Sequence, residues 1–139
     1  MIFESFSAED TLQFAAKLAQ KAKPGDVYCL SGPLGAGKTV FAQGFAAGLG
    51  YTEPVTSPTF TLMNVHDGGR LILYHFDLYR LPDDGAAALE GIGAEDFFYA
   101  QGVCLIEWPN RAGHLIPETA YHIDINTDYA HDYRKIVVR

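Results

Sequence analysis

The stretch from Gly32 to Thr39 reads GPLGAGKT and matches the phosphate-binding pattern G-x-x-x-x-G-K-[ST] at every fixed position. Such a loop turns successive backbone N–H groups toward phosphates, and its glycines permit the required backbone angles and the close approach. Lys38 is expected to reach the outer phosphates, and the Thr39 hydroxyl to bind Mg²⁺. The predicted nucleotide-binding residues are Gly32, Pro33, Leu34, Gly35, Ala36, Gly37, Lys38, Thr39 and Val40.

Two carboxylates follow apolar runs farther along the chain. Asp77 comes directly after the run 70–76, where it could act on a metal or on water, or could cap the next turn. Glu107 ends the run from Val103 and is the best candidate for the second acid near Mg²⁺; its structural alternative is a surface salt bridge. Trp108 follows Glu107 and either packs in the core or acts as a switch-like residue at the edge of the nucleotide.

A hydroxyl-rich stretch is the second informative segment. Thr56, Ser57, Pro58 and Thr59 could form a loop that senses the last phosphate, as in nucleotide switches, although a plain turn leading into a strand is the simpler reading. The histidines at positions 66 and 75 are interpreted as ordinary surface or strand residues and not as a metal-binding pair.

The elements around the loop are those the motif needs. The run 27–30 predicts a strand before it, and residues 39–49 predict a helix after it, ended by Gly50. The other predicted elements are a strand at 2–6, a helix from Ser7 to Ala22, a hairpin of 60–65 with 70–76, short helices at 86–89 and 95–99, a buried strand at 103–107 and a terminal hairpin of 120–126 with 134–138.

The composition of the chain excludes several classes of protein. A chain of 139 residues with 48% apolar and 19% charged residues is typical of a globular domain, but it is small for a kinase with its own lid and acceptor domain. No long apolar run or basic leader is present, so we expect a cytoplasmic protein without a membrane partner. The net charge of -7 argues against independent nucleic-acid binding. Cys29 and Cys104 lie in apolar runs and are expected to be packed thiols.

Taken in order, these motifs resemble the bacterial TsaE family, also called YjeE, over nearly the whole chain. The stretches that carry the resemblance are Leu34-Gly35-Ala36-Gly37-Lys38-Thr39, Thr56-Ser57-Pro58-Thr59-Phe60-Thr61-Leu62, His75-Phe76-Asp77-Leu78-Tyr79-Arg80 and Leu105-Ile106-Glu107-Trp108-Pro109. The resemblance implies a single P-loop NTPase-like α/β domain over residues 1–139, with a central mixed β-sheet flanked by helices. It also implies an ATPase of tRNA threonylcarbamoyladenosine biosynthesis that is weak alone and depends on TsaB and TsaD, with tRNA reached only through these partners.

The resemblance also implies roles for single residues. The loop from Thr56 to Thr59 would act as a switch, Asp77 would act in hydrolysis near Mg²⁺, Glu107 would be the Walker B-like acid, and Trp108 would be a sensitive neighbour of the nucleotide. The chain departs from the family's pattern at Asn64-Val65-His66, where members often carry tyrosine, which puts an aromatic contact from this position in doubt.

Mg-ATP hydrolysis with Lys38, Asp77 and Glu107 as catalytic residues is therefore the expected activity, with Thr39 and Glu107 at the metal and Asp77 as a further candidate ligand. Two alternatives stay open. A small-molecule kinase would need an arginine-rich lid, and no segment resembles one. A non-catalytic subunit that senses nucleotide would bind partners under the control of ATP without hydrolysing it. A GTPase is disfavoured because no guanine-recognition signature such as Asn-Lys-x-Asp occurs.

Overall fold

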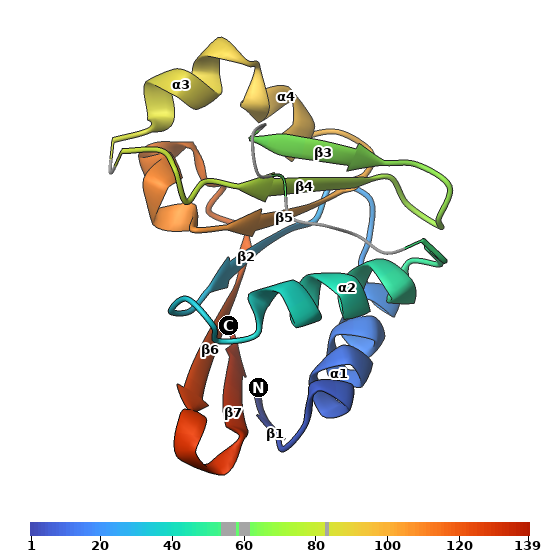
Figure 1. The fold of residues 1–139 in the computed structure, drawn as a ribbon. Helices are drawn as coiled ribbons and strands as arrows, with labels where there is room; N and C mark the ends of the chain where they lie inside the picture. Colours follow the sequence, from blue (N-terminus) through green and yellow to red (C-terminus); the bar gives the residue numbers. More distant parts are fainter. Residues whose placement is uncertain (54–57, 59–61, 83) are drawn as a thin grey trace.

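The computed structural model describes residues 1–53, 58, 62–82 and 84–139, and within them seven strands form one sheet of order β1-β7-β6-β2-β5-β4-β3 (Figure 1). The central strands β6, β2, β5 and β4 run parallel, and the edges are antiparallel. The predicted mixed sheet is thus confirmed. The strands are β1 (Ile2–Ser5), β2 (Val27–Ser31), β3 (Met63–His66), β4 (Leu73–Asp77), β5 (Val103–Glu107), β6 (Tyr121–Asp128) and β7 (Tyr133–Val138).

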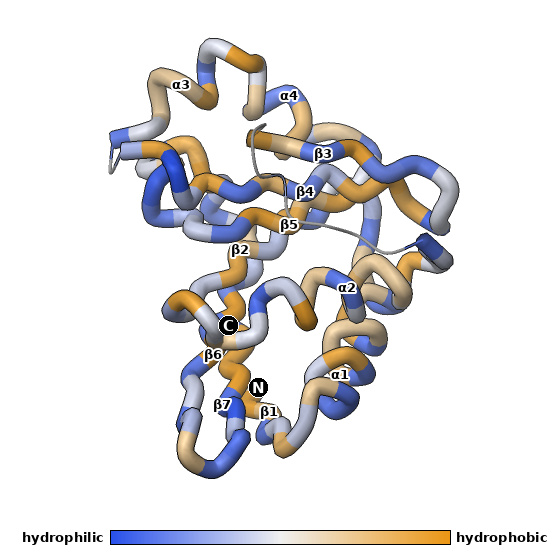
Figure 2. The backbone as a smooth tube through the Cα atoms, in the orientation of Figure 1, coloured by the Kyte–Doolittle hydropathy of each residue, from blue (hydrophilic) through white to orange (hydrophobic). Residues whose placement is uncertain are grey.

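Helices cover both faces of the sheet. On one face lie α1 (Ala8–Gln20) and α2 (Lys38–Gly48), and their buried side chains share a core with Leu30, Leu73 and Leu105. On the other face, α3 (Ala86–Gly91), α4 (Ala94–Phe98) and the 3₁₀ segment η1 (Pro109–Leu115) pack over Phe76 and Ile106. Figure 2 shows apolar stretches along the central strands and polar residues at the turn between β6 and β7. The central strands are apolar because both of their faces are covered.

The two helices next to the phosphate-binding motif pack unusually closely. Ser7 caps α1 by accepting a hydrogen bond of 3.0 Å from the backbone N–H of Asp10. A Cβ atom at Gly44 of α2 would lie 2.4 Å from the carbonyl oxygen of Leu12 in α1. Only glycine allows this approach, so Gly44 sets the close packing of α2 against α1.

Most predicted elements are confirmed, with shifted ends. Strand β4 begins at Leu73 and not at Arg70, because the Arg70 guanidinium donates hydrogen bonds to the carbonyls of Ala19 (2.8 Å) and Ala22 (3.0 Å) at the end of α1. The segment η1 was not predicted. The predicted strand at 60–65 lies partly outside the described residues. No helix among the described residues is long and apolar enough to cross a membrane.

Both thiols are buried in the sheet, as the sequence predicts. Cys29 of β2 and Cys104 of β5 are free cysteines, and burial raises the pKa of each to about 12. Such thiols are unreactive packing groups. They therefore play no part in the site described below.

Candidate functional site

The loop from Gly32 to Gly37 connects the end of β2 to the start of α2 (Figure 1). Gly35 (φ 79°) and Gly37 (φ 101°) adopt the left-handed conformation that favours glycine. Gly37 is the N-cap of α2, and no side chain among the described residues caps the helix. The N–H groups of the first turn and the positive end of the helix dipole are therefore available to an anion.

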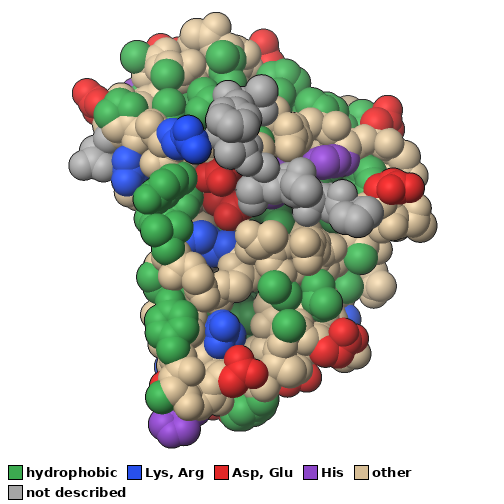
Figure 3. Space-filling model, viewed as in Figure 1, with side chains coloured by type: hydrophobic (Ala, Val, Ile, Leu, Met, Phe, Trp, Pro, Cys, Tyr) green, Lys and Arg blue, Asp and Glu red, His purple; other side chains and the backbone are tan. Residues whose placement is uncertain are grey.

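A cavity of about 400 Å³ opens at this loop. On the face seen in Figure 3, acidic and basic side chains lie side by side in a hollow near the middle of the molecule. The cavity brings together the loop, Lys38, both candidate carboxylates and the tryptophan that follows the second one. Its lining residues are Leu34, Gly35, Gly37, Lys38, Thr39, Val40, Asp77, Tyr79, Glu107, Trp108 and Arg134.

Lys38 folds back over the loop. It is 7% exposed, and its Nζ donates hydrogen bonds to the carbonyl oxygens of Gly32 and Pro33, the latter at 3.3 Å. Burial lowers the pKa of Lys38, while the carboxylates of Glu107 and Asp77 act in the opposite direction. The ammonium group therefore lies close to both acids and to the loop that would hold phosphates.

Glu107 lies at the carboxyl end of β5 and is 3% exposed. Its Oε2 lies 2.7 Å from Nε2 of His75, which is 0% exposed. The alternative of a surface salt bridge for Glu107 is therefore wrong, because the partner is a buried histidine. The interpretation of His75 as an ordinary surface or strand residue also missed this contact. The clue was its spacing of two residues from Asp77, which places both side chains on one face of β4.

Asp77 ends β4 beside Glu107, its direct partner in the strand register. Its Oδ1 accepts a hydrogen bond of 3.1 Å from the backbone N–H of Tyr79, so Asp77 caps the turn and also lines the cavity. Burial raises the pKa of Asp77, the charge of Glu107 adds to this, and the Tyr79 N–H, His75 and Lys38 oppose it. The turn-capping alternative for Asp77 is therefore confirmed, and its role at a metal or a water stays a prediction.

Trp108 has a positive φ of 59°, which is uncommon for a residue with a side chain. This backbone turn directs the chain from β5 into η1. The ring centroid of Trp108 lies 5.1 Å from that of Tyr79, and the Trp108 side chain is partly buried against the core under α3 and α4. Trp108 thus packs on the core and also lines the cavity.

The segment 56–59 lies mostly outside the described residues. Thr56, Ser57 and Thr59 are not described, and Pro58 is buried. The switch role of this loop therefore stays a prediction.

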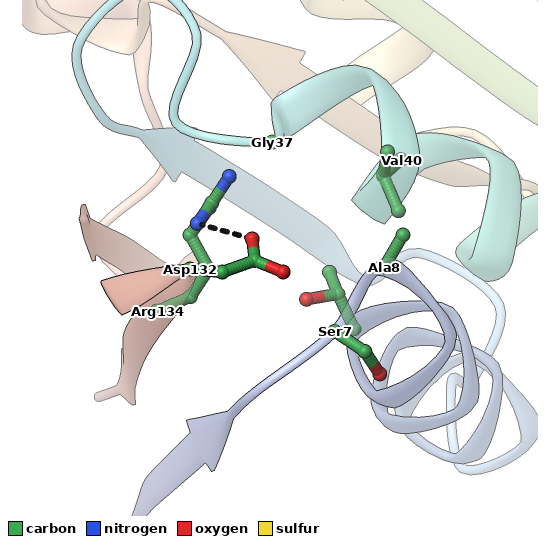
Figure 4. A pocket seen from close by; sticks show the side chains of 7 residues that line it. Ser7, Ala8, Gly37, Val40, Asp132 and Arg134 are labelled. Carbon is green, nitrogen blue, oxygen red and sulfur yellow. Dashed lines mark ion pairs between the residues drawn. The ribbon is translucent and has the colours of Figure 1, made fainter. Parts of the chain in front are cut away.

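A second, smaller pocket of about 140 Å³ adjoins the loop on the other side of Gly37. Its walls come from the start of α1, the start of α2 and the start of β7 with the residue before it, as Figure 4 shows. Arg134 donates from Nε to the carbonyl oxygen of Ala36 (2.9 Å) and pairs with Asp132 (3.6 Å). Sequence reasoning missed this pocket, because its residues come from three distant segments without a shared motif.

The oxygen ligands near the loop fit a magnesium ion whose coordination shell is completed by phosphate oxygens. Thr39, Asp77 and Glu107 line one cavity and offer a hydroxyl and two carboxylates, the ligand types that Mg²⁺ prefers. Among the described residues, no group of three or more His, Cys, Asp or Glu side chains could hold a metal ion. Such a site suits Mg²⁺ that arrives with a phosphate ligand, because Mg²⁺ often uses one or two carboxylates together with substrate phosphates.

Comparison with known proteins identifies the family. The family model described as "Threonylcarbamoyl adenosine biosynthesis protein TsaE" matches residues 5–136. The chain belongs to the TsaE family. Among curated TsaE relatives, each named tRNA threonylcarbamoyladenosine biosynthesis protein TsaE, that of Bacillus subtilis (strain 168) is 44% identical over 88% of this chain and 75% of the relative. That of Treponema pallidum (strain Nichols) is 45% identical over 87% of each chain.

A solved TsaE-like structure shares the fold. The crystal structure of YdiB from Bacillus subtilis superposes with a TM-score of 0.79 at 38% identity, covering 98% of this chain and 82% of that chain. The resemblance to TsaE drawn from the four motifs is thus confirmed, and so is the α/β sheet flanked by helices. The family model covers residues 5–136, which include the whole of strands β2 to β6.

Proposed function

We propose that this chain binds Mg-ATP on the loop from Gly32 to Thr39 and hydrolyses it during tRNA threonylcarbamoyladenosine biosynthesis. The observation that carries the proposal is that Lys38, Asp77 and Glu107 line one cavity at the mouth of this loop. A phosphate-binding loop alone would support only binding. Two carboxylates beside the lysine add groups that can organise a metal ion and orient water.

Phosphate binding is assigned to the loop amides, the first turn of α2 and Lys38. The left-handed glycines turn the backbone so that N–H groups can converge on an anion. Lys38 already lies within the cavity, but its Nζ is bonded to the carbonyls of Gly32 and Pro33. A triphosphate would offer stronger, charged acceptors, so we expect Lys38 to leave these carbonyls when nucleotide binds.

We assign separate catalytic roles to the remaining polar groups of the cavity. Thr39 and Glu107 would hold Mg²⁺, which would supply positive charge to neutralise the phosphates. Asp77 would orient the attacking water or a water at the metal. Its raised pKa suits a carboxylate that must accept a hydrogen bond from water at close range. Trp108 would lie beside Lys38, where its ring face attracts the ammonium group.

The smaller pocket beyond Gly37 is proposed to receive the nucleoside part of ATP. It continues from the loop across the start of α2, as Figure 4 shows, and offers the Asp132 carboxylate as an acceptor. Arg134 borders both the pocket and the larger cavity. Its guanidinium could therefore contact the α-phosphate or ribose while supporting the loop at Ala36.

Hydrolysis is proposed to drive the cycle of a TsaB/TsaD-type complex in the cytoplasm. The name of the family and of its curated relatives supports a role in modifying tRNA. A net charge of -7 does not suit direct tRNA binding, which supports the view that partner proteins hold the tRNA.

Calorimetric titration with Mg-ATP and single-turnover hydrolysis test this proposal on the purified chain. Lys38→Ala should abolish measurable binding, and Glu107→Gln should retain binding but slow hydrolysis by about 100-fold or more. Lys135→Ala changes an exposed lysine of β7 and should behave as wild type. Full binding and turnover by Lys38→Ala would overturn the assignment of the loop. If the wild-type chain binds ATP tightly but does not hydrolyse it, either alone or with its partners, the chain is a nucleotide sensor.

A further inference from the structure

His75 and Glu107 form a buried pair on the face of the sheet that carries α2. The two atoms that meet, His75 Nε2 and Glu107 Oε2, are 2.7 Å apart, and the residues are 0% and 3% exposed. A carboxylate group has only acceptor atoms, so this hydrogen bond requires the His75 tautomer that carries its proton on Nε2. This is the charged type of hydrogen bond, which is shorter and stronger than a neutral one.

The strand register explains how the two side chains meet. Asp77 of β4 is the direct partner of Glu107 on β5, and His75 is the partner of Leu105. Side chains two residues apart lie on the same face of a strand. His75 therefore lies on the same face of β4 as Asp77, two residues farther from the carboxyl end of the strand. The Glu107 carboxylate therefore has the aspartate beside it and the histidine behind it.

The imidazole does little else among the described residues. Its Nδ1 is buried and has no hydrogen-bond partner there, and its neighbours on the strand face, Leu73 and Leu105, are core residues. Burying a polar ring in such surroundings is unfavourable unless a hydrogen bond compensates. An apolar side chain would fill the position at lower cost, which points to a function in the contact with Glu107.

We propose that His75 is a positioning residue that holds the Glu107 carboxylate in the orientation needed at Mg²⁺, an inference that rests on the proposed ATPase function. His75 does not line the cavity and is fully buried, so it acts through Glu107 and not on substrate. Glutamate has three rotatable side-chain bonds, and ordering them opposes metal binding. A carboxylate already fixed by His75 avoids much of that ordering when the ion arrives.

Loss of this hydrogen bond should weaken metal binding more than nucleotide binding. Partners behind a metal ligand typically change metal affinity or activity by about 10- to 100-fold when they are replaced. His75→Leu removes the donor and should weaken Mn²⁺ binding to the ADP complex by this factor. Nucleotide affinity measured in EDTA should stay at the wild-type value, because His75 does not touch the loop.

Two amide variants separate positioning from packing. His75→Gln carries an N–H donor near the position of Nε2 and should recover most of the Mn²⁺ affinity. His75→Asn has a shorter side chain that cannot reach Glu107 and should resemble His75→Leu. The matched control is His66→Leu, which removes a partly buried histidine from the neighbouring strand β3 and should leave Mn²⁺ binding unchanged.

The experiment is Mn²⁺ titration followed by electron paramagnetic resonance on the full chain with ADP. It is repeated in a Glu107→Gln background, with thermal unfolding used to select folded variants. If His75 acts through Glu107, His75→Leu or His75→Asn should add no further loss there, within about twofold.

Each outcome tests the inference. Wild-type Mn²⁺ affinity in a folded His75→Leu or His75→Asn variant would overturn it, and so would equal losses in His75→Gln and His75→Asn. A full further loss in the Glu107→Gln background would also overturn it, because His75 would then act separately from Glu107. A wild-type chain that binds neither ADP nor Mn²⁺ would overturn the proposed function and this inference with it.

Discussion

The Nζ atom of Lys38 lies 4.0 Å from the centroid of the Trp108 ring while it donates hydrogen bonds to the loop carbonyls of Gly32 and Pro33. The lysine expected to bind phosphate is thus held by the loop itself and by the ring of the residue after Glu107. An ammonium group at this distance from an indole ring is attracted by about 0.5–2 kcal/mol. We expect nucleotide binding to break the hydrogen bonds to the loop carbonyls and to shift the ammonium group relative to the ring.

Trp108 fluorescence should therefore report nucleotide binding. Trp108 is the only tryptophan in the sequence, so emission comes from one site. We expect Mg-ATP to change the emission of the wild-type chain as Lys38 moves to the phosphates. In Lys38→Ala the ammonium group beside the Trp108 ring is absent, so the emission without nucleotide should differ from that of wild type. ATP should then have no effect on the emission. An unchanged wild-type spectrum at saturating ATP would contradict the proposed movement of Lys38.

Arg134 should contribute to ATP affinity through the loop. Its Nε donates to the carbonyl oxygen of Ala36 at 2.9 Å, and it lies at the boundary of the two pockets. A hydrogen bond to a charged group contributes about 1.5–3 kcal/mol, so Arg134→Leu should raise the Kd for Mg-ATP by about tenfold or more. Arg139→Leu removes an exposed arginine that pairs with Asp124 and serves as the matched control. Equal affinities of the two variants in calorimetry would contradict this role.

Asp77 should destabilise the metal-free protein at neutral pH. Its pKa is raised above 3.8 in the folded state, so the folded chain binds this proton more tightly than the unfolded chain does. The unfolding free energy therefore falls as the pH rises from 3.8 through the folded-state pKa. Asp77→Asn removes this penalty, and because the carboxylate is partly exposed the gain should stay below about 1 kcal/mol.

Thermal unfolding in EDTA at a series of pH values measures this effect. The melting temperature of Asp77→Asn should exceed that of wild type at neutral pH, and the difference should shrink as the solution is acidified. Asp84→Asn is the control at an exposed carboxylate that does not line the cavity. A constant difference across the pH series would contradict the raised pKa of Asp77.

Gly44 should be essential for the packing of α2 against α1. A Cβ atom there would lie 2.4 Å from the carbonyl oxygen and 2.8 Å from the Cα of Leu12, so the helices would have to separate. Forcing an extra carbon into a close-packed contact costs about 1–3 kcal/mol. Chemical denaturation of Gly44→Ala should show this loss. Gly91→Ala, where a Cβ meets nothing within 4 Å, should be neutral or slightly stabilising.

Local sequence patterns predict the loop, its flanking strand and helix, and both hairpins, because each depends on neighbouring residues. Apolar runs that end in Asp77 and Glu107 also predict two carboxylates at one edge of the sheet. The pairing of His75 with Glu107 could not be read in this way, since it depends on the register of β4 against β5. Arg134 was missed for a similar reason, because the terminal hairpin folds back to the loop from the far end of the chain.

The central claim is that this chain is an ATPase whose turnover serves a partner complex. Phosphate release from Mg-ATP, measured for the chain alone and with a TsaB/TsaD pair, tests it most directly. The account predicts slow release by the chain alone, strong stimulation by the pair, and loss of both rates in Lys38→Ala but not in Lys135→Ala. Equal release by wild type and Lys38→Ala, or no stimulation by a pair that binds the chain, would contradict it.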